Sequence, residues 1–430
     1  MGYEKQPRKG KISSIEAVQM IKSGQRIAFS PVCAEPQDLI KSLVEYKDNL
    51  EDVKIYTMLP MQKCPYVLPE MEGHFKVKAF SVGGHLMEAV NRGQAEYVPC
   101  HLSQIPGFFT NGIIPVDLAL IQLSSPDTQG FCSVGVSASY TRQVLDAAKT
   151  VIAEINDQMP RTLGDTFVHL SRVDYLVESS HPLPEVPSPK LGAVEKRIAE
   201  FTAELIPDGA VLQVGIGNIA EAILRELKEK KNLSVHTGTF SDGILELVEA
   251  GAFDSKKGDS RSARLFTAEL IGTARLYKFC HNNPLVEMKS INYTHNIHVA
   301  GKIEKLISVT SAIQIDLDGQ VNAEMLGTKL VNGVGGQLDF LRATASSPGG
   351  KGVVAFPSTA RKGKVSRIVP SLDKGAVVTV GRADIDCVVT EYGVAHLSGK
   401  SLSERAKELI SIAHPDFREQ LNRDYNKPKH

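Results

Sequence analysis

The chain alternates short apolar runs rich in β-branched residues with segments of helical periodicity, and no other feature constrains its fold as strongly. This alternation is typical of α/β domains with mainly parallel strands, because a parallel pair needs a crossover connection that is usually a helix. In the first half we predict strands at Gln25–Ser30, Val53–Leu59, Lys76–Ser81, Leu118–Ser124 and Val151–Ile155, and helices at Pro36–Tyr46 and Arg142–Ala148.

A proline-rich stretch interrupts the alternation. Its sequence, HPLPEVPSP at His181–Pro189, holds four prolines in nine residues, which excludes a regular helix or a central strand. We therefore predict a linker between a first domain of residues 1–185 and a second domain of residues 190–430. Beyond the linker we predict helices at Gly192–Leu205, Ile219–Lys230, Asp242–Ala250, Thr273–His281 and Leu402–Ala413, and strands at Ala210–Val214, Leu233–Thr237, Arg264–Leu270, Leu306–Ile315, Val353–Phe356, Ala376–Val380 and Cys387–Thr390.

The charges of the chain balance, with 49 Lys and Arg against 49 Asp and Glu. A net charge of zero gives no bulk attraction to nucleic acid or to an anionic membrane, so we expect neither as a partner. The basic N-terminus leads into no apolar run long enough for a signal peptide or a membrane-spanning helix. Six cysteines stand singly, without a Cys-x-x-Cys pair, which favours a reducing, cytoplasmic location. His295 and His298 have no carboxylate at ligand spacing, so we expect no metal site.

A glycine turn in the second half has the pattern of an anion-binding site. Gln213, Val214, Gly215, Ile216 and Gly217 end an apolar run and open a predicted helix, whose free N–H groups attract an anion. A nicotinamide cofactor would also require an acidic residue at the end of the next strand, which instead reads VHTG. The pattern therefore indicates a phosphate or oxyanion site, with a plain strand-to-helix turn as the alternative.

A second group of glycines lies further along the chain. Gly333, Gly335 and Gly336 are followed by the GGKG segment at residues 349–352. Such turns can cradle a ligand, and Lys351 could pair with a phosphate or carboxylate. Plain turns are the alternative here as well.

The second glycine group belongs to a longer block, VNGVGGQLDFLRATASSPGGKGVVAFPSTA at Val331–Ala360, that resembles the signature block of the acetyl-CoA hydrolase/transferase family. This family includes the 4-hydroxybutyrate and butyrate CoA-transferases. Further segments resemble the family in the same order: HLSQIPGFF at 101–109, DLALIQLSSPDTQGFCSVGVSASY at 117–140, LQVGIGNI at 212–219, SDG at 241–243, LYKFCHNNP at 276–284 and TEYGVAHLSGKS at 390–401.

The resemblance implies two tandem α/β domains of the CoA-transferase type (NagB/RpiA-like), with the active site in the cleft between them. It implies an enzyme that moves CoA between a short acyl-CoA and a small carboxylate of the acetate, butyrate, 4-hydroxybutyrate, succinate or itaconate class. A glutamate nucleophile would carry the acyl group and then CoA, as a glutamyl-CoA thioester. Coenzyme A would enter as a thioester substrate, with no permanently bound cofactor, and contact residues 213–217, the 333–336 loop and Lys351. A homodimer or homotetramer is implied by analogy.

The chain departs from the family at the nucleophile. Family members typically read His-Thr-Glu-Met-x-Ser-Asp-Gly, whereas this chain reads His236-Thr237-Gly238 followed by TFSDG. Gly238 therefore holds the place of the glutamate and has no side chain with which to attack. Three explanations for this departure remain open. The catalytic carboxylate lies at another position, the transferase step has been lost, or the sequence of the chain has been altered.

Glu269 is our candidate for a relocated nucleophile. It ends the strand predicted to follow the Gly238 strand, and neighbouring parallel strands lie only ~4.8 Å apart. The alternatives are a solvated or ion-paired Glu269, or a nucleophile at Glu324 or Glu391. His236 flanks the vacated position and could orient a substrate or carboxylate, although a packed histidine is the plainer interpretation.

The first domain is expected to shape the acyl pocket. Met61 and Gln62 follow a predicted strand and could select the acyl group. Glu35 precedes a predicted helix, where an acidic residue is favoured by the helix dipole, so we expect it to cap that helix. Two alternative functions remain at this point: an acyl-CoA hydrolase, and a CoA-binding protein without transferase activity.

Overall fold

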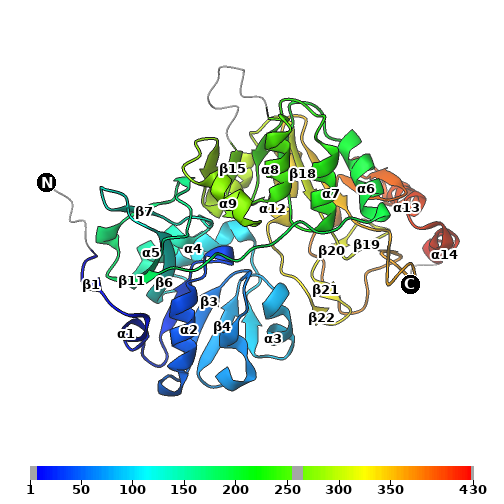
Figure 1. The fold of residues 1–430 in the computed structure, drawn as a ribbon. Coiled ribbons are helices and arrows are strands. Elements are labelled where there is room, and N and C mark those ends of the chain that lie inside the picture. Colours follow the sequence, from blue (N-terminus) through cyan, green and yellow to red (C-terminus); the bar gives the residue numbers. More distant parts are fainter. Residues whose placement is uncertain (1–6, 254–264, 428–430) are drawn as a thin grey trace. The chain divides into compact units, whose positions relative to one another are not determined.

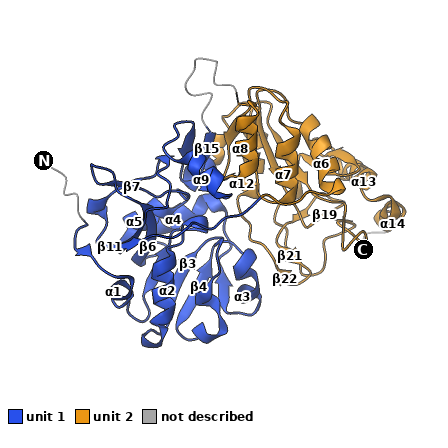
Figure 2. Cartoon of the chain, viewed as in Figure 1, with its two compact units in different colours: residues 1–187, 264–294 blue, residues 188–263, 295–430 orange. Residues whose placement is uncertain are grey.

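The computed structural model describes residues 7–253 and 265–427, and its chain forms two compact units (Figures 1 and 2). Unit 1 comprises residues 1–187 and 264–294, and unit 2 comprises residues 188–263 and 295–430. The first crossing between units lies within the predicted linker, which has no helix or strand. The expected division into 1–185 and 190–430 differs in one respect, because the 264–294 segment packs with unit 1, where its strand β17 (Val286–Met288) pairs with β9 (Leu163–Gly164).

Unit 1 is built on an eight-stranded sheet in which every pairing is parallel. Its central strand β6 (Val116–Ser124) is buried along its whole length, as a strand covered on both faces must be. The strand order is β1 (Gly10–Lys11), β11 (Tyr175–Ser179), β8 (Ala148–Asn156), β6, β2 (Arg26–Phe29), β3 (Val53–Thr57), β4 (Phe75–Ala79) and β5 (Ala95–Tyr97).

Most helices of unit 1 lie between these strands along the chain, α9 and α10 belong to the 264–294 segment, and a smaller group of strands completes the unit. The helices are α1 (Ser14–Val18), α2 (Gln37–Glu45), α3 (Met87–Asn91), α4 (Ile105–Thr110), α5 (Thr141–Ala147), α9 (Ala274–Cys280) and α10 (Ile291–Thr294). The further strands are the antiparallel pair β7 (Phe131–Ser133) and β10 (Phe167–His169), the parallel group β15 (Leu265–Thr267), β17 and β9, and the short β16 (Glu269–Leu270).

Unit 2 contains a second mainly parallel sheet. Its order is β28 (Gly393–His396), β27 (Cys387–Thr390), β23 (Lys351–Ala355), β18 (Leu306–Thr310), β12 (Val211–Val214) and β13 (Ser234–His236), with only the β27–β28 pairing antiparallel. Its helices are α6 (Ala193–Glu204), α7 (Asn218–Glu226), α8 (Asp242–Glu249), α11 (Ile297–Ala300), α12 (Gln337–Ser346), α13 (Leu402–Ser411) and α14 (Pro415–Tyr425). Short strands complete it: β14 (Thr239–Phe240), β19 (Gln314–Asp316), β20 (Val321–Asn322), β21 (Met325–Leu326), β22 (Lys329–Leu330), β24 (Thr359–Ala360), β25 (Val365–Ser366) and β26 (Ile368–Val369).

Each main sheet has a point at which the direction of strand succession reverses. In unit 1 the chain proceeds outward from β2 to β5 and then returns to place β6 on the other side of β2. In unit 2 the reversal lies between β12 and β18, since β13 is on one side of β12 and the later strands are on the other. Ligands of open α/β sheets bind at such switch points, outside the carboxyl ends of the strands.

The sequence-based elements agree with the structure except in three places. The strand predicted at Arg264–Leu270 divides into β15 and β16, which belong to different sheets, and Arg264 itself lies outside the described residues. The other two differences lie further along the chain. The predicted strand at Ala376–Val380 is wrong, because only Val380 pairs there, in an isolated bridge with Val321. The predicted strand Leu306–Ile315 divides into β18 and β19, which join different sheets. In both cases the β-branched residues indicated an extended apolar segment. They did not indicate which strand it pairs with, because pairing depends on residues far away in the chain.

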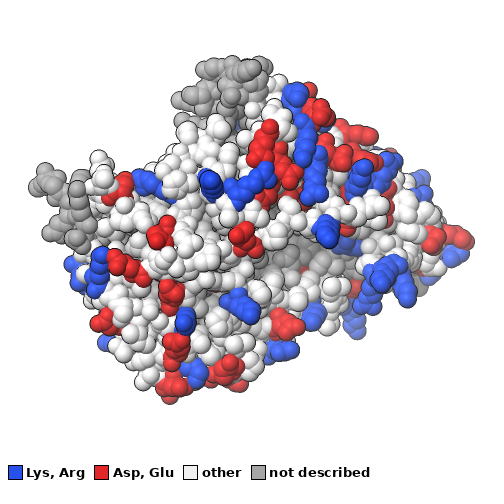
Figure 3. Space-filling view, in the orientation of Figure 1, with Lys and Arg blue, Asp and Glu red and all other residues white. Residues whose placement is uncertain are grey.

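No helix within residues 7–253 and 265–427 has the length and hydropathy needed to cross a membrane. On the face drawn in Figure 3, basic and acidic side chains are interspersed. That distribution agrees with the balanced composition.

Candidate active site

Two strained loops follow the neighbouring strands β2 and β3, next to the switch point between β2 and β6. Val32 follows β2 with φ of 60°, and Leu59 follows β3 with φ of 45°. The loops are tied together, since Val32 N donates to Met58 O over 3.1 Å and Met61 N donates to Val32 O over 3.3 Å. A β-branched residue in the left-handed region is rare, and such strain persists mainly where surrounding structure holds a functional geometry.

Glu35 lies at the end of the first of these loops and is fully buried. Its carboxyl accepts hydrogen bonds from Thr57 Oγ1 (2.7 Å), Tyr66 Oη (2.8 Å) and Gln62 Nε2 (3.3 Å). The expectation that Glu35 caps a helix is wrong, because these three partners engage its side chain and α2 begins after Pro36 without a side-chain cap. Burial raises the pKa of Glu35 to about 7, against the opposing effect of its hydrogen bonds.

The predicted acyl-pocket residues lie beside this carboxyl. Gln62 is held by its bond to Glu35, and Met61 by its backbone bond to Val32. Both side chains are partly exposed. Gln62 therefore contacts a buried acid at the carboxyl edge of β2 and β3, and Met61 precedes it in the same loop.

Glu269, the predicted nucleophile, is also buried in unit 1. It follows β15 in the short strand β16 and is 5% exposed, so it is not a solvated glutamate. Among residues 7–253 and 265–427, no donor meets the geometry of a hydrogen bond to either of its carboxyl oxygens. Burial raises the pKa of Glu269 to about 8, and the nearby hydroxyls of Ser137 and Ser139 partly offset that rise. Its predicted proximity to Gly238 stays a prediction, because the two residues belong to different units.

The segment beside Glu269 carries more unpartnered polar atoms. Ser137 forms an antiparallel bridge with Glu269, and the backbone nitrogens of Ala138 and Ser139 both point at Ala268 O. The hydroxyls of Ser137, Ser139 and Tyr140 are fully buried and have no hydrogen-bond partner in the part of the chain that the structure describes. Buried hydroxyls are paired in most native structures, so such a group marks a place where a ligand or ordered water is expected.

The glycine turn of unit 2 lies at that unit's switch point. Gly215 follows β12, and Gly217, with φ of 108°, precedes α7. A Cβ placed on either glycine would meet no protein atom within 4 Å, so open space borders the turn. The backbone at Gly215 to Gly217 is thus accessible to a ligand at the N-terminus of a nine-residue helix.

The second glycine loop reaches the same edge. Gly333 to Gly336 lead into α12, and Gln337 Nε2 at its start donates to Thr310 Oγ1 at the carboxyl end of β18 over 3.0 Å. Because β18 is paired with β12, the structure brings the two glycine loops to neighbouring strand ends.

Lys351 is placed elsewhere. It is the first residue of β23 and aligns with Ile307, near the start of β18. The carboxyl edge of β23 is at Ala355, roughly 13 Å further along the extended strand. The register therefore does not bring Lys351 to the glycine loops. The sequence alone could not show this, because the strand pairing decides which edge of the sheet holds Lys351.

A histidine occupies the position vacated at Gly238. A Cβ on Gly238 would lie 2.7 Å from Cε1 and 2.9 Å from Nε2 of His295. His295 packs on Phe340 with ring centroids 4.6 Å apart, and its burial, together with the nearby His236, lowers its pKa to about 3. His236 is itself buried at the end of β13. The two imidazoles and Gly238 thus form one packed group.

The other candidate glutamates are engaged in structural hydrogen bonds. Glu391 accepts from the backbone nitrogen of Ser358 (2.8 Å) and from its hydroxyl (2.7 Å). Glu324 is buried and accepts from Thr379 Oγ1 over 2.8 Å. A carboxylate already satisfied in this way is a poorer nucleophile than one without partners.

One group of side chains in unit 1 has the composition of a metal site. Ligand atoms of Asp38, Glu154 and His181 lie within 4.8 Å of one another. However, His181 Nε2 is 2.7 Å from Glu154 Oε1, and Ser179 Oγ donates to Asp38. Burial opposes protonation of His181, but the hydrogen bond and charge of Glu154 outweigh it and raise the His181 pKa. Glu154, His181 and Asp38 already have hydrogen-bond partners, so these groups are described as a hydrogen-bonded cluster.

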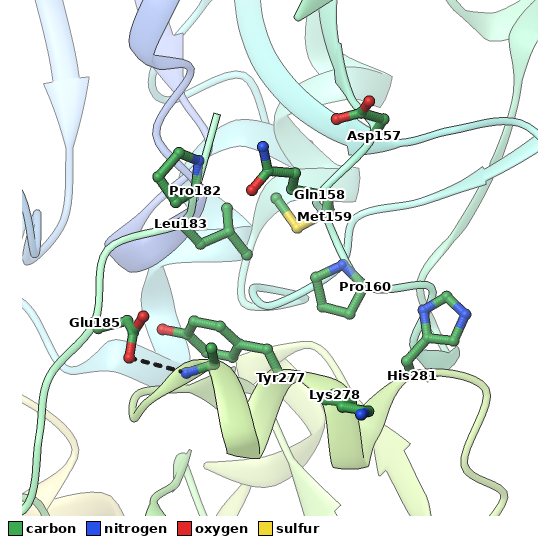
Figure 4. A pocket seen from close by; sticks show the side chains of 11 residues that line it. Asp157, Gln158, Met159, Pro160, Pro182, Leu183, Glu185, Tyr277, Lys278 and His281 are labelled. Carbon is green, nitrogen blue, oxygen red and sulfur yellow. Dashed lines mark hydrogen bonds between the residues drawn. The ribbon is translucent and has the colours of Figure 1, made fainter. Parts of the chain in front are cut away.

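A pocket of about 480 Å³ in unit 1 lies between residues 157–160, the linker and α9. Figure 4 shows Met159, Leu183 and Tyr277 around this space, with Glu185 bonded to the first backbone nitrogen of α9. Tyr277 Oη donates to Pro184 O over 2.6 Å. None of the side chains drawn there has a buried polar atom without a partner, which sets this pocket apart from the surroundings of Glu269.

Two known domain families match the chain. Residues 1–187 match the acetyl-CoA hydrolase/transferase N-terminal domain, and residues 272–425 match the C-terminal domain of the same family. The chain belongs to the acetyl-CoA hydrolase/transferase family. The predicted family is thereby confirmed.

Family relatives with transferase names cover nearly the whole chain. The chain is 49% identical to 4-hydroxybutyrate coenzyme A transferase of Clostridium kluyveri, over 99% of this chain and 100% of that protein. It is 39% identical to the succinyl-CoA:acetate/propanoyl-CoA:succinate CoA transferase of Fasciola hepatica, over 95% and 86%. The crystal structure of 4-hydroxybutyrate CoA-transferase from Porphyromonas gingivalis matches with a TM-score of 0.83 and 36% identity, over 96% of each chain. These findings confirm the predicted α/β fold and CoA-transferase class.

Sequence reasoning missed several residues of this family member's candidate site. Ser137, Ser139 and Tyr140 lie in the SVGVSASY segment, which resembled the family but was assigned no role. The serines of this segment, which lie between a glycine and a helix, could have indicated a polar site. No sequence pattern pointed to Tyr66, because only the fold brings its hydroxyl to Glu35.

Proposed function

We propose that this protein transfers CoA between a short-chain acyl-CoA and a small carboxylate, with Glu269 as the carboxylate that receives the acyl group. The carboxylate attacks the thioester carbonyl, the C–S bond breaks, and CoA leaves as a thiolate. The thiolate then attacks the glutamyl carbonyl of the mixed anhydride, which releases the first carboxylate and leaves a glutamyl-CoA thioester. A second carboxylate reverses the two steps and departs as the new acyl-CoA. The thioester energy is conserved throughout.

The observation that carries this proposal is the state of the Glu269 carboxyl. Both oxygens are buried and have no hydrogen-bond partner among the described residues, in a chain whose residue 238 is a glycine. An unpartnered buried carboxyl is costly for the fold, and such a cost is typical of groups retained for chemistry. Glu324 and Glu391 lack this feature, since both accept hydrogen bonds.

Glu269 must lose its proton before it can attack. With a pKa raised to about 8, most of the carboxyl is neutral at pH 7, and a minority is the reactive anion. The anion is poorly solvated in its buried site, which makes it more reactive than a carboxylate in water. Transfer should therefore accelerate as the pH rises toward 8.

The glycine loops support a role in binding CoA. The turn at Gly215–Gly217 and the loop at Gly333–Gly336 lie at neighbouring strand ends and precede helices of nine and ten residues. Backbone N–H groups at helix N-termini suit phosphate groups. Lys351 is not included in this proposal because of its place at the opposite strand end.

Covalent trapping tests the nucleophile. The protein is incubated with acetyl-CoA or butyryl-CoA, treated with borohydride and digested, and modified glutamates are mapped by mass spectrometry. Reduction should convert the glutamyl thioester at residue 269 to the alcohol. Modification of another glutamate would contradict the assignment of Glu269, and transfer activity with no trapped glutamate would contradict the covalent route.

Matched variants complete the test. Glu269→Gln keeps the shape of the side chain and should lower transfer by at least about 1000-fold, since loss of a covalent nucleophile removes the main route. Glu154→Gln is the control, because Glu154 is equally buried in unit 1 but bonded to Leu39 N and to His181. It should retain transfer if it folds. Full activity in Glu269→Gln would overturn the proposal.

Two broader expectations accompany this function. We expect a cytoplasmic protein, because the six cysteines are free thiols and short-chain acyl-CoA chemistry uses a reducing compartment. We also expect a homodimer or homotetramer, by analogy with the family. Light scattering coupled to gel filtration measures the second directly.

A further inference from the structure

The first part of the linker lies along unit 1 and is bonded to it at both ends. At its start, Asn156 Nδ2 donates to His181 O over 2.9 Å, and His181 Nε2 lies 2.7 Å from Glu154 Oε1. Gln37 Nε2 at the start of α2 donates to Pro182 O over 3.3 Å. This end of the linker is thus fixed to β8 and to α2.

The other end is bonded to the backbone that follows Glu269. Three hydrogen bonds join it to residues 272–277, and Figure 4 shows one of them, from Glu185 to the first backbone nitrogen of α9. The bonds are Val186 N to Gly272 O (2.9 Å), Ala274 N to Glu185 Oε2 (3.1 Å) and Tyr277 Oη to Pro184 O (2.6 Å). We call residues 181–186 the strap.

The strap is stiff because of its prolines. The rings of Pro182 and Pro184 fix their φ angles, and each proline also keeps the residue before it out of the helical region. Leu183 between them is 7% exposed and lines the pocket drawn in Figure 4. A stiff segment that is anchored at one end holds whatever is bonded to its other end, which a flexible segment does not.

The Glu269 carboxyl depends on its backbone for its orientation. No hydrogen bond within the described residues holds either of its oxygens. On one side the backbone is held by the bridge between Ser137 and Glu269. On the other side the strap bonds begin at Gly272, three residues further along the chain. A reacting group needs such support from its surroundings to keep a productive geometry.

We propose that the strap is a positioning element for the reacting carboxyl, holding the backbone after Glu269, with Glu185 as a positioning residue. The role rests on the proposed function, in which Glu269 receives the acyl group. A misplacement of about 1 Å can lower a rate by about 100-fold, so a loosened strap should slow the chemical step. It should also admit water to the carboxyl, which favours the charged form and lowers the pKa of Glu269.

Replacement of the two prolines tests the stiffness of the strap. Pro182→Gly with Pro184→Gly keeps both carbonyl acceptors, and Pro69→Gly, at an exposed proline of unit 1, is the control. With acetyl-CoA and butyrate, kcat should fall at least about 10-fold while the KM for acetyl-CoA stays within about 3-fold. The midpoint of the pH–rate profile should move down, and Pro69→Gly should change neither quantity. Parental kcat and midpoint in the folded strap variant would overturn the inference.

A pair of substitutions tests the anchor at Glu185. Glu185→Ala removes the acceptor of Ala274 N, whereas Glu185→Gln keeps an oxygen there, and both should fold because the side chain is exposed. Glu185→Ala should lower kcat at least about 5-fold, and Glu185→Gln should stay within about 2-fold of the parent. Glu16→Ala is the control, since Glu16 likewise accepts from a backbone nitrogen, that of Ser13, beside α1. Parental kcat in Glu185→Ala, or an equal loss in both Glu185 variants, would overturn the anchoring role.

Combination of the changes tests whether the strap acts as one element. Once the prolines are replaced, the bond to Glu185 no longer holds the backbone after Glu269. Glu185→Ala should then lower kcat by less than about 2-fold further. If the two losses multiply, the contacts act independently and the strap is not one positioning element.

Failure of the proposed function gives a different result. If Glu269→Gln transfers CoA at the parental rate, Glu269 is not the nucleophile, and the proposed function fails whatever the strap variants do. If Glu269 is trapped but the strap variants keep the parental kcat and midpoint, the proposed function stands and only the role of the strap is lost.

Discussion

The imidazole of His295 occupies the space in which a side chain at position 238 would begin. A Cβ on Gly238 would come within 2.7 Å of His295 Cε1, a contact that real Cβ atoms do not make. A side chain can therefore be added at position 238 only if the imidazole of His295 shifts or is removed.

This relationship predicts an energetic coupling between the two positions. Gly238→Ala should destabilise the protein by about 1–3 kcal/mol through overpacking, because His295 is buried against Phe340 and has little room to move. In His295→Ala the same change should cost much less. Urea unfolding of both single variants and the double variant yields the coupling, and strict additivity would contradict it.

Glu269 should make the stability of the protein depend on pH. Its folded pKa of about 8 lies above the value of 4.5 for an unperturbed glutamate, so the folded state binds this proton more tightly than the unfolded state. The stability contributed by that proton is therefore complete below about pH 4.5 and is lost as the pH rises to 8. Glu269→Gln should gain stability relative to the parent by about 1–4 kcal/mol over this range. Thermal melts at pH 5, 7 and 9 measure the difference, and a constant difference would refute it.

Ser137 and Ser139 should tune the reactive carboxyl. Their hydroxyls lower the pKa of Glu269, so Ser137→Ala together with Ser139→Ala should raise it and move the midpoint of the pH–rate profile upward. A midpoint that stays in place would show that the serines do not act on Glu269.

Glu35 should be important for the stability of unit 1. Glu35→Ala leaves the donors of Thr57, Tyr66 and Gln62 without their acceptor, which should cost about 2–4 kcal/mol. Tyr66→Phe removes one of these bonds and should cost about 1 kcal/mol. Chemical denaturation measures the free energy of unfolding of both variants. If Glu35→Ala is as stable as the parent protein, the three hydrogen bonds to Glu35 do not contribute as described.

The glycine turn of unit 2 allows binding to be separated from folding. A Cβ at Gly215 would meet no protein atom within 4 Å, and its φ is not in the left-handed region, so Gly215→Ala should fold with unchanged stability. If a CoA phosphate approaches this backbone closely, the added methyl should weaken CoA binding by about 10-fold or more. Calorimetric titration with CoA provides the measurement. Gly381→Ala is the control, because a Cβ there would make only an ordinary contact 3.6 Å from Asp384 Oδ2. Unchanged affinity would remove Gly215 from the proposed site.

The features of the site that could be predicted are those that depend on residues adjacent in the sequence. The turn at 213–217 was recognisable because glycines after an apolar run and before a helix have one common structural meaning. Glu269 was recognisable because it is an acid at the end of an apolar strand. Glu35 was also noticed, but its role as a helix cap was wrong, since the carboxyl found stronger partners 22 and 31 residues away in the chain.

The sequence by itself determined the α/β class, the parallel strands, the linker and the family, including the missing side chain at 238. These properties follow from periodicity, proline and glycine content and motif order, all of which are local. Only the tertiary structure decided that residues 264–294 join unit 1, that Lys351 lies at the amino edge of its sheet, and that His295 fills the space beside Gly238. It also left the Glu269 oxygens without partners. Each of these depends on strand register and on side chains far apart in the chain, and short-range sequence patterns do not specify such contacts.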